Sequence, residues 1–258
     1  MKASCQAANT IERCIIISQA TTHTGAHLIQ PSDPAYEPDN HTYNTSVARR
    51  LRLDHPSAKT PHGVTTHCPN NTASGHVCGQ LLDSKMNHSM VCNKGRGIVS
   101  RHDAIVRCLA DIIQKKAGIP TRVEQWIPTM QRTNANGNVE HARLDVVFVQ
   151  DGQPTYVDVA VVTPFSTNSE DLAAASAKAG YMAKRAERGK FKRYPYHKLI
   201  PFVLETTGRP GQQAKKFIQN LFRDSTNTVN QIRDAWACIQ SALQSHISQT
   251  QLKTVKSC

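Results

Sequence analysis

Two consecutive segments rich in β-forming residues, joined by a short polar turn, most constrain how this chain can fold. Residues 143–150 (RLDVVFVQ) and 155–163 (TYVDVAVVT) are dominated by valine and other strand formers. The four residues between them, 151–154 (DGQP), have the chemistry of a tight turn. We therefore predict a hairpin of two buried strands.

Each predicted strand carries one aspartate, Asp145 in the first and Asp158 in the second. Carboxylates are rare inside apolar strands unless they are paired or bound to a metal. A hairpin can bring both side chains to one edge of a sheet, and carboxylate oxygens are ligands that Mg²⁺ prefers. The pair therefore suggests a magnesium site. A structural alternative is open for Asp145, which follows Arg143 and could be a salt-bridged residue at a strand end.

Hydrophobic periodicity predicts further elements on both sides of the hairpin. We expect no regular element in residues 1–45, a short basic helix within 44–53 and a helix over 101–117 that Ser100 caps. The other expected elements are strands at 121–126, 142–149, 155–162 and 198–206, and helices at 169–188, 212–222 and 228–247. This order predicts an α/β fold around a small mixed sheet.

The charge of the chain points to a polyanionic partner. The formal net charge is +12 and the pI is near 9.5, so nucleic acid is the leading candidate, because basic residues gain affinity by displacing counterions from phosphates. A basic protein without such a partner is the alternative. No run approaches the roughly 18–20 apolar residues that cross a bilayer, so we expect an intracellular protein whose eight cysteines are thiols or metal ligands.

Cysteine and histidine residues are concentrated in a polar segment, residues 65–92. His88 and Cys92 are four positions apart and share one face of a helical turn, and Cys78 precedes a glycine that lets backbone amides approach a thiolate. His76, with Cys68 as the alternative, is the candidate for the remaining position of a zinc site. Zinc would supply folding energy that so polar a segment lacks. The alternative is a disordered loop with free thiols.

The order of these motifs resembles the C-terminal restriction-like endonuclease of LINE-type (non-LTR) retrotransposons, over about residues 46–222. In that family a Cys/His zinc knuckle precedes a nuclease of the PD-(D/E)xK fold. The residues that carry the resemblance are Cys78-Gly79, His88 and Cys92, Asn93-Lys94-Gly95, Arg101-His102, Val123-Glu124, Arg143-Leu144-Asp145, Val157-Asp158-Val159, Lys190 with Tyr194, Pro201-Phe202-Val203, Glu205-Thr206, Gly208 and Gly211.

The resemblance implies a Mg²⁺-dependent DNA endonuclease that nicks a target strand, so that the freed 3′-hydroxyl primes reverse transcription. Asp145 and Asp158 would hold the metal, and Lys190, from the following helix, would be the catalytic lysine. Glu124 would be an additional metal or water ligand. Residues expected to contact nucleic acid are Arg101, His102, Lys184, Lys192, Arg193 and Tyr194, with Lys184 and Lys192 also alternatives for the catalytic lysine.

The resemblance also divides the chain and implies its partners. We expect a partly disordered linker with a short basic helix at 1–64, a zinc knuckle at 65–97, the nuclease domain at 98–225 and a helix with a tail at 226–258. The partners would be DNA and the RNA of the element, with no membrane, and the location nuclear. Because the chain shows no reverse transcriptase domain, it would be a fragment or remnant of a longer polyprotein, with a separately expressed nuclease as the alternative. The alternative is a non-catalytic zinc and nucleic-acid-binding module from a decayed element.

Two positions depart from the family pattern. His76 occupies the place of the first cysteine in the usual Cys-x-Cys, and Leu144 replaces the proline that usually precedes the first catalytic aspartate.

Overall fold

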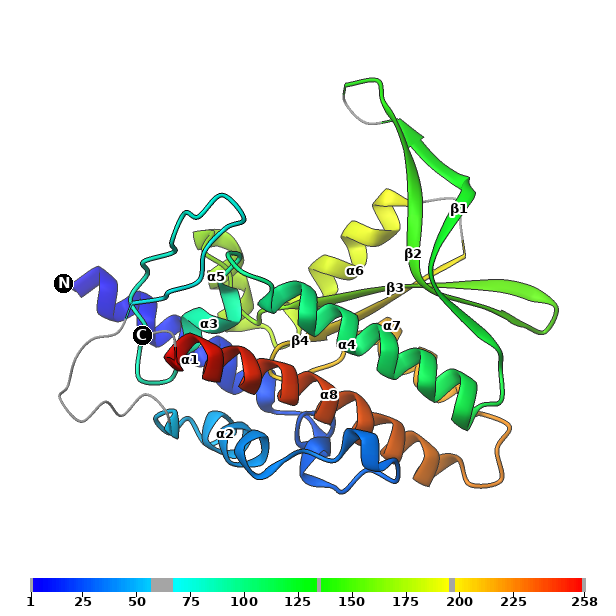
Figure 1. The fold of residues 1–258 in the computed structure, drawn as a ribbon, viewed down its shortest axis with the longest axis horizontal. Coiled ribbons are helices and arrows are strands. Elements are labelled where there is room, and N and C mark those ends of the chain that lie inside the picture. The colour runs from blue at the N-terminus through cyan, green and yellow to red at the C-terminus, as the bar shows by residue number, and fades with distance from the viewer. Residues whose placement is uncertain (1, 57–66, 134–135, 195–197, 257–258) are drawn as a thin grey trace.

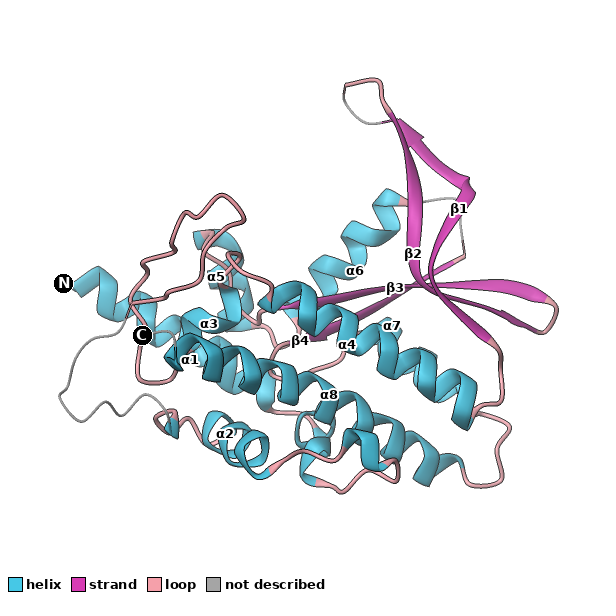
Figure 2. Ribbon diagram, viewed as in Figure 1, coloured by secondary structure: helices cyan, strands magenta, loops and turns pink. Residues whose placement is uncertain are grey.

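The fold is an α/β arrangement with helices on both faces of a four-stranded mixed sheet (Figures 1 and 2). The computed structural model describes residues 2–56, 67–133, 136–194 and 198–256. Residues 65 and 66 of the predicted knuckle, and 195–197 within the basic segment after Lys190, lie outside these ranges. The ends of the four predicted domains at 1, 64 and 258 lie outside them as well.

The sheet has the strand order β1-β2-β3-β4. β1–β2 and β2–β3 are antiparallel, and β3–β4 is parallel. All four strands fall where the sequence predicts them, although three begin or end several residues outside the predicted bounds. The strands are β1 (Thr121–Thr133), β2 (Val139–Gln150), β3 (Gln153–Val162) and β4 (Leu199–Glu205).

The predicted hairpin is confirmed. Gln150 pairs with Gln153, so only Asp151 and Gly152 lie in the loop. Both have positive φ, 51° and 71°, as a two-residue turn that follows the twist of antiparallel strands requires. Beyond the other end of this ladder, β1 and β2 continue away from β3 as a separate two-stranded arm (Figure 2).

Helices precede, separate and follow the strands along the chain. They are α1 (Lys2–Gln19), the 3₁₀ segments η1 (Thr22–Leu28) and η2 (Pro34–Tyr36), α2 (Asn40–Arg50), α3 (Asn87–Val91), α4 (Gly97–Asp111) with the π-helical turn η4 (Ile112–Lys116), α5 (Ser169–Ala177), α6 (Tyr181–Arg193), α7 (Gln212–Leu221) and α8 (Thr228–Lys256). None of them, within the described part of the chain, has both the length and the apolar character of a bilayer-spanning segment.

The main core lies between one face of the sheet and α4, α7 and α8. Val146, Val157 and Phe202 from the strands pack there with Leu109 of α4 and Ile239 of α8, and all five are fully buried. Helix α6 covers β3 and β4 on the other side of the sheet (Figure 1). The catalytic candidates Asp158 and Lys190 therefore belong to a strand and to the helix that crosses it.

Several helices differ from the sequence expectation. The first 45 residues, where no regular element is expected, contain α1, η1, η2 and the start of α2. The helix expected at 169–188 is two helices, α5 and α6, because Gly180 has φ 73° between them. Ser100 is not an N-cap: it lies inside α4, and its hydroxyl is 2.8 Å from Nδ1 of His246.

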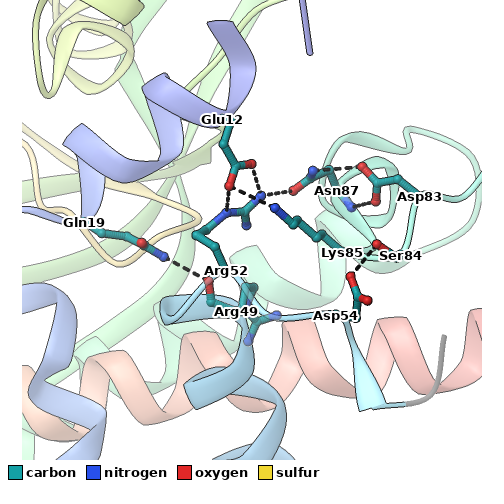
Figure 3. A network of polar contacts seen from close by, with 9 residues as sticks. All are labelled: Glu12, Gln19, Arg49, Arg52, Asp54, Asp83, Ser84, Lys85 and Asn87. Carbon is teal, nitrogen blue, oxygen red and sulfur yellow. Dashed lines mark hydrogen bonds and ion pairs between the residues drawn. The ribbon is translucent and has the colours of Figure 1, made fainter. Parts of the chain in front are cut away.

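A network of polar contacts fixes the Cys/His segment to the N-terminal helices (Figure 3). Glu12 of α1 accepts hydrogen bonds from Arg52 Nε at 2.8 Å and Lys85 Nζ at 3.1 Å. Arg52 also donates to Asn87, which starts α3. Since α3 carries His88 and ends directly before Cys92, two of the predicted zinc ligands, this network links the knuckle to α1.

Candidate functional site

Asp145 and Asp158 lie at the same level of two neighbouring strands. The β2–β3 ladder ends at the pair Val146↔Val157, and one further step in the same register would put the two aspartates opposite each other. Instead, β2 leaves β3 at this point, and the Asp145 carboxylate accepts a hydrogen bond from the Val159 amide at 2.6 Å. The strand geometry thus brings both predicted acidic residues to one place.

A basic residue from a helix contacts each aspartate. Lys190 Nζ of α6 forms an ion pair with Asp158 Oδ1, and His102 Nε2 of α4 lies 3.3 Å from Asp145 Oδ2. The side chains of the two aspartates are only 14% and 13% exposed, so these contacts are largely shielded from water. The site therefore combines residues from the adjacent strands β2 and β3 with residues from the helices α4 and α6.

The environment shifts the pKa values of these groups in different directions. Burial raises the pKa of Asp158, Lys190 opposes that shift, and the neighbouring Asp145 adds to it. Burial also acts to raise the pKa of Asp145, but the hydrogen bond and charge of His102, with the Val159 amide, hold it below its usual value. The hydrogen bond with Asp145 raises the pKa of His102 to about 9, so His102 is protonated at neutral pH.

Glu124 lies opposite Asp145 in the register of β1 and β2, but its side chain contacts Arg143. Its neighbours pair as Val123↔Val146 and Gln125↔Leu144, so the register puts Glu124 opposite Asp145. However, Glu124 has φ 53°, a conformation rare for non-glycine residues, and its carboxylate forms an ion pair with Arg143 at the surface. The structure does not bring Glu124 into contact with either aspartate, contrary to the role expected for it.

The residues expected to contact nucleic acid differ in their exposure to solvent. Arg101 is 2% exposed and donates to the Met90 carbonyl at 3.0 Å, so the prediction that it touches DNA is wrong. Tyr194 is half-buried and packs against the cluster of Met130, Ala142, Leu144 and Leu199. The other expected contacts, apart from His102, are exposed on α6: Lys184, Lys192 and Arg193.

Three cysteines and one histidine come together in the knuckle. The ligand atoms of Cys68, Cys78, His88 and Cys92 all lie within 4.8 Å of one another. The sulfurs of Cys68 and Cys92 are 3.7 Å apart, and Cys78 Sγ lies 3.3 Å from His88 Nε2. Cys68, the alternative ligand, is therefore in the cluster. His76 is outside it: its exposed ring lies 3.1 Å from the Ser74 hydroxyl.

Two short elements produce this cluster. Antiparallel bridges His67↔Leu81 and Asn71↔Val77 form a small hairpin, which places Cys68 and Cys78 side by side. The Gly79 amide donates to the Cys68 carbonyl at 3.0 Å, with a Gly79 φ of 67° that favours glycine. Helix α3 then supplies His88, and Cys92 follows its last turn.

The donor set fits zinc. A tetrahedral ion with Zn–S bonds of about 2.3 Å requires sulfur atoms about 3.8 Å apart, close to the 3.7 Å between Cys68 and Cys92. Arg101 adds an independent indication, because its buried Nε and Nη1 have no hydrogen-bond partner within the described residues. Burial lowers its pKa to about 10, and Cys92 opposes this shift. A buried guanidinium near Cys92 would offset the net negative charge of a Cys₃His zinc complex.

Comparison with known proteins adds no assignment. No protein-family model matches the chain, and a search of curated proteins finds no match.

Proposed function

We propose that this protein is a Mg²⁺-dependent DNA endonuclease that nicks one strand, with a structural zinc knuckle beside the nuclease domain. The observation that carries the proposal is the group formed by Asp145, Asp158 and Lys190: two adjacent, largely buried carboxylates with an ammonium group on one of them. The mixed sheet flanked by helices is compatible with a restriction-like fold.

The two aspartates have the properties of a magnesium site. Their carboxylates are hard oxygen donors at the same level of the sheet. Burial raises the pKa of Asp158, Lys190 opposes that shift and Asp145 adds to it, so a bound cation would favour the charged carboxylate. When bound, Mg²⁺ would activate a water molecule and neutralise charge on the phosphate. The Val159 amide and His102 hold the Asp145 carboxylate in a fixed orientation, so part of the site is organised by the protein alone.

Lys190 and its neighbours supply positive charge. The Lys190 ammonium, held at Asp158, would stabilise negative charge that develops on a phosphate during hydrolysis. Lys192 and Arg193 are exposed in the next turn of α6 and would contact the DNA backbone. The net charge of +12 supports a nucleic acid substrate.

The zinc knuckle has a structural role in this proposal. All four ligand positions are filled by protein groups, which is typical of structural zinc and leaves no position for a substrate. A nick made at the nuclease centre would expose a 3′-hydroxyl for reverse transcription, as the family resemblance implies.

Nicking of supercoiled plasmid tests the proposal. Wild-type protein should convert plasmid to the open circle with Mg²⁺ and not without it. Asp145→Asn and Asp158→Asn should each reduce nicking at least about a hundredfold, because the metal loses a charged ligand, while DNA binding is retained. Asp224→Asn, at an 84% exposed carboxylate, is the matched control and should nick normally.

The same assay separates the alternative function. If wild-type protein binds DNA but nicks it with none of Mg²⁺, Mn²⁺ and Co²⁺, the protein is a zinc and nucleic-acid-binding module without nuclease activity.

A further inference from the structure

Helix α6 directs its basic residues to two different places. Lys190 contacts Asp158, whereas Lys184 and Arg188 line a separate pocket of about 430 Å³ together with Phe191. These three residues share one face of α6, and Lys190 is turned roughly 120° around the helix axis from them. The opposite wall comes from the segment between β4 and α7, including Arg209 and Lys215.

The pocket carries an excess of positive charge. In the described ranges, Lys184, Arg188 and Lys215 form no ion pair, and Arg209 donates to the backbone carbonyls of Ile17, Ser18 and Ala20. Burial lowers the pKa of Lys215, and the nearby charge of Arg209 lowers it further. Four cations therefore line a space whose lining includes one carboxylate, that of Glu187.

The one carboxylate in the lining does not balance these cations. Glu187 is 5% exposed, and its Oε1 accepts the Gln213 amide at 2.8 Å. Glu187 also interacts with the charge of Lys184, so it offsets part of the positive charge of the pocket. An anion with more than one negative charge, or a chain of anions, would complement the remaining cations.

Phe191 indicates which polyanion fits. Its side chain is a large apolar group, and the residue is 39% exposed beside lysine and arginine side chains. An accessible aromatic ring next to a basic groove is the arrangement by which proteins hold single-stranded nucleic acid, with a base stacked on the ring and phosphates on the cations. The pocket volume lies within the roughly 300–1,000 Å³ of ligand sites.

We propose that the pocket between α6 and α7 binds a single-stranded segment of nucleic acid, with one base on Phe191 and the flanking phosphates on Lys184, Arg188 and Lys215. The inference rests on the proposed function in one respect, that the partner is nucleic acid. The single-stranded nucleic acid would contact the face of α6 that carries Phe191, whereas Lys190 of the same helix contacts Asp158. Binding of the single strand and cleavage can therefore be tested separately.

Fluorescence polarisation with a labelled 15-nucleotide single strand, and with the duplex of the same sequence, tests this without added Mg²⁺. Lys184→Gln combined with Arg188→Gln should weaken single-strand binding about tenfold and reduce the salt dependence by about 0.7 per charge removed. Lys115→Gln combined with Arg223→Gln removes the same charge at side chains that are 58% and 71% exposed elsewhere, and should change binding less than twofold.

The aromatic residue is tested separately. Phe191→Ala should weaken single-strand binding at least about fivefold, while Phe191→Tyr, which keeps a stacking surface, should bind normally. Circular dichroism and zinc content confirm that each variant is folded. The proposal is overturned if the pocket variant loses no more affinity than the control, if Phe191→Ala binds like wild type, or if single strand and duplex lose affinity equally.

Nicking by the same variants distinguishes the two proposals. Protein that binds single strands through the pocket but never nicks would overturn the nuclease and leave the pocket. Protein that nicks normally while pocket variants bind like wild type would overturn the pocket alone.

Discussion

The Asp145 carboxylate accepts a hydrogen bond from the Val159 backbone amide at 2.6 Å, at the point where β2 separates from β3. The amide loses its strand partner there, and the carboxylate replaces it. A side chain that completes the hydrogen bonding of a buried strand has little rotational freedom. The same carboxylate is therefore fixed before any metal or His102 contributes.

The contact between His102 and Asp145 predicts a pH-dependent stability. The folded pKa of His102 is about 9, above its usual value of 6.5. The contact thus stabilises the folded state fully below about pH 6.5, and this contribution is lost as the pH rises through 9. We expect the stability difference between wild type and His102→Gln to fall by about 1–2 kcal/mol from pH 6 to pH 9.5, since the pair is only partly exposed.

Urea unfolding of both proteins at these two pH values measures that difference. His141→Gln, at an exposed histidine of β2, is the control and should show a constant small difference. A His102→Gln difference that does not change between pH 6 and 9.5 would contradict the ion pair.

The ligand set of the knuckle predicts opposite effects for two neighbouring candidates. Cys68 is fully buried in the cluster, whereas His76 is exposed and outside it. Elemental analysis should find one zinc per chain in wild type and in His76→Ala, and much less in Cys68→Ser. Because zinc binding is coupled to folding, Cys68→Ser should also unfold at a lower temperature. Zinc loss in His76→Ala with full zinc in Cys68→Ser would reverse the assignment.

A close approach at the end of β4 predicts a strong glycine requirement. A methyl group on Gly208 would lie 2.1 Å from Gln240 Oε1, and Gly208 has φ 92°. Gln240 is fully buried and donates to the Gly208 carbonyl at 2.6 Å, so it cannot move away freely. Gly208→Ala should therefore cost about 3 kcal/mol or more of unfolding free energy, from steric overlap and backbone strain together.

Gly118→Ala is the control for that prediction. Gly118 also has a positive φ, 69°, but no atom lies within 4 Å of the added methyl group. Only the backbone strain of a positive φ applies, so Gly118→Ala should lower the free energy of unfolding by about 1 kcal/mol. Equal costs for the two variants in urea unfolding would show that Gln240 does not restrict Gly208.

The sequence was sufficient for the sheet and for the acidic pair. Valine-rich strands with an Asp-Gly turn determine both the hairpin and its register, and the register aligns Asp145 with Asp158. The contact of Lys190 with Asp158 matches the residue that the family resemblance singled out. The contact of His102 with Asp145 depends on how α4 crosses the sheet, which no local pattern encodes.

Helix α2 begins four residues before the predicted basic helix (44–53), because part of its buried face is polar. In α2, Thr45 and Arg49 are buried, and Arg49 donates to Gln244 and Gln251 of α8. Hydrophobic periodicity cannot detect a helix that packs through hydrogen bonds. The choice of Cys68 over His76 depends similarly on cross-strand pairing in a small hairpin, which ligand spacing alone does not reveal.

The network around Glu12 predicts that α1 holds the knuckle in place. The hydrogen bond from Arg52 keeps the pKa of Glu12 below its usual value, so the carboxylate is charged at pH 7 and accepts from both Arg52 and Lys85 (Figure 3). Glu12→Gln should cost about 1 kcal/mol, because a charge-assisted pair is replaced by neutral contacts. Hydrogen exchange at residues 83–91 should accelerate, while exchange in β3 should not change.

The control is Asp224→Asn, which disrupts an ion pair with Arg223 whose side chains are 71% and 84% exposed. Exposed pairs contribute little to stability, so this variant should unfold like wild type, with unchanged exchange at 83–91. Equal exchange in the Glu12→Gln and wild-type knuckles would mean that zinc and the core contacts of Met86 and Met90 position α3 without α1. Accelerated exchange confined to 83–91 would instead place the N-terminal helix among the elements that support the metal centre.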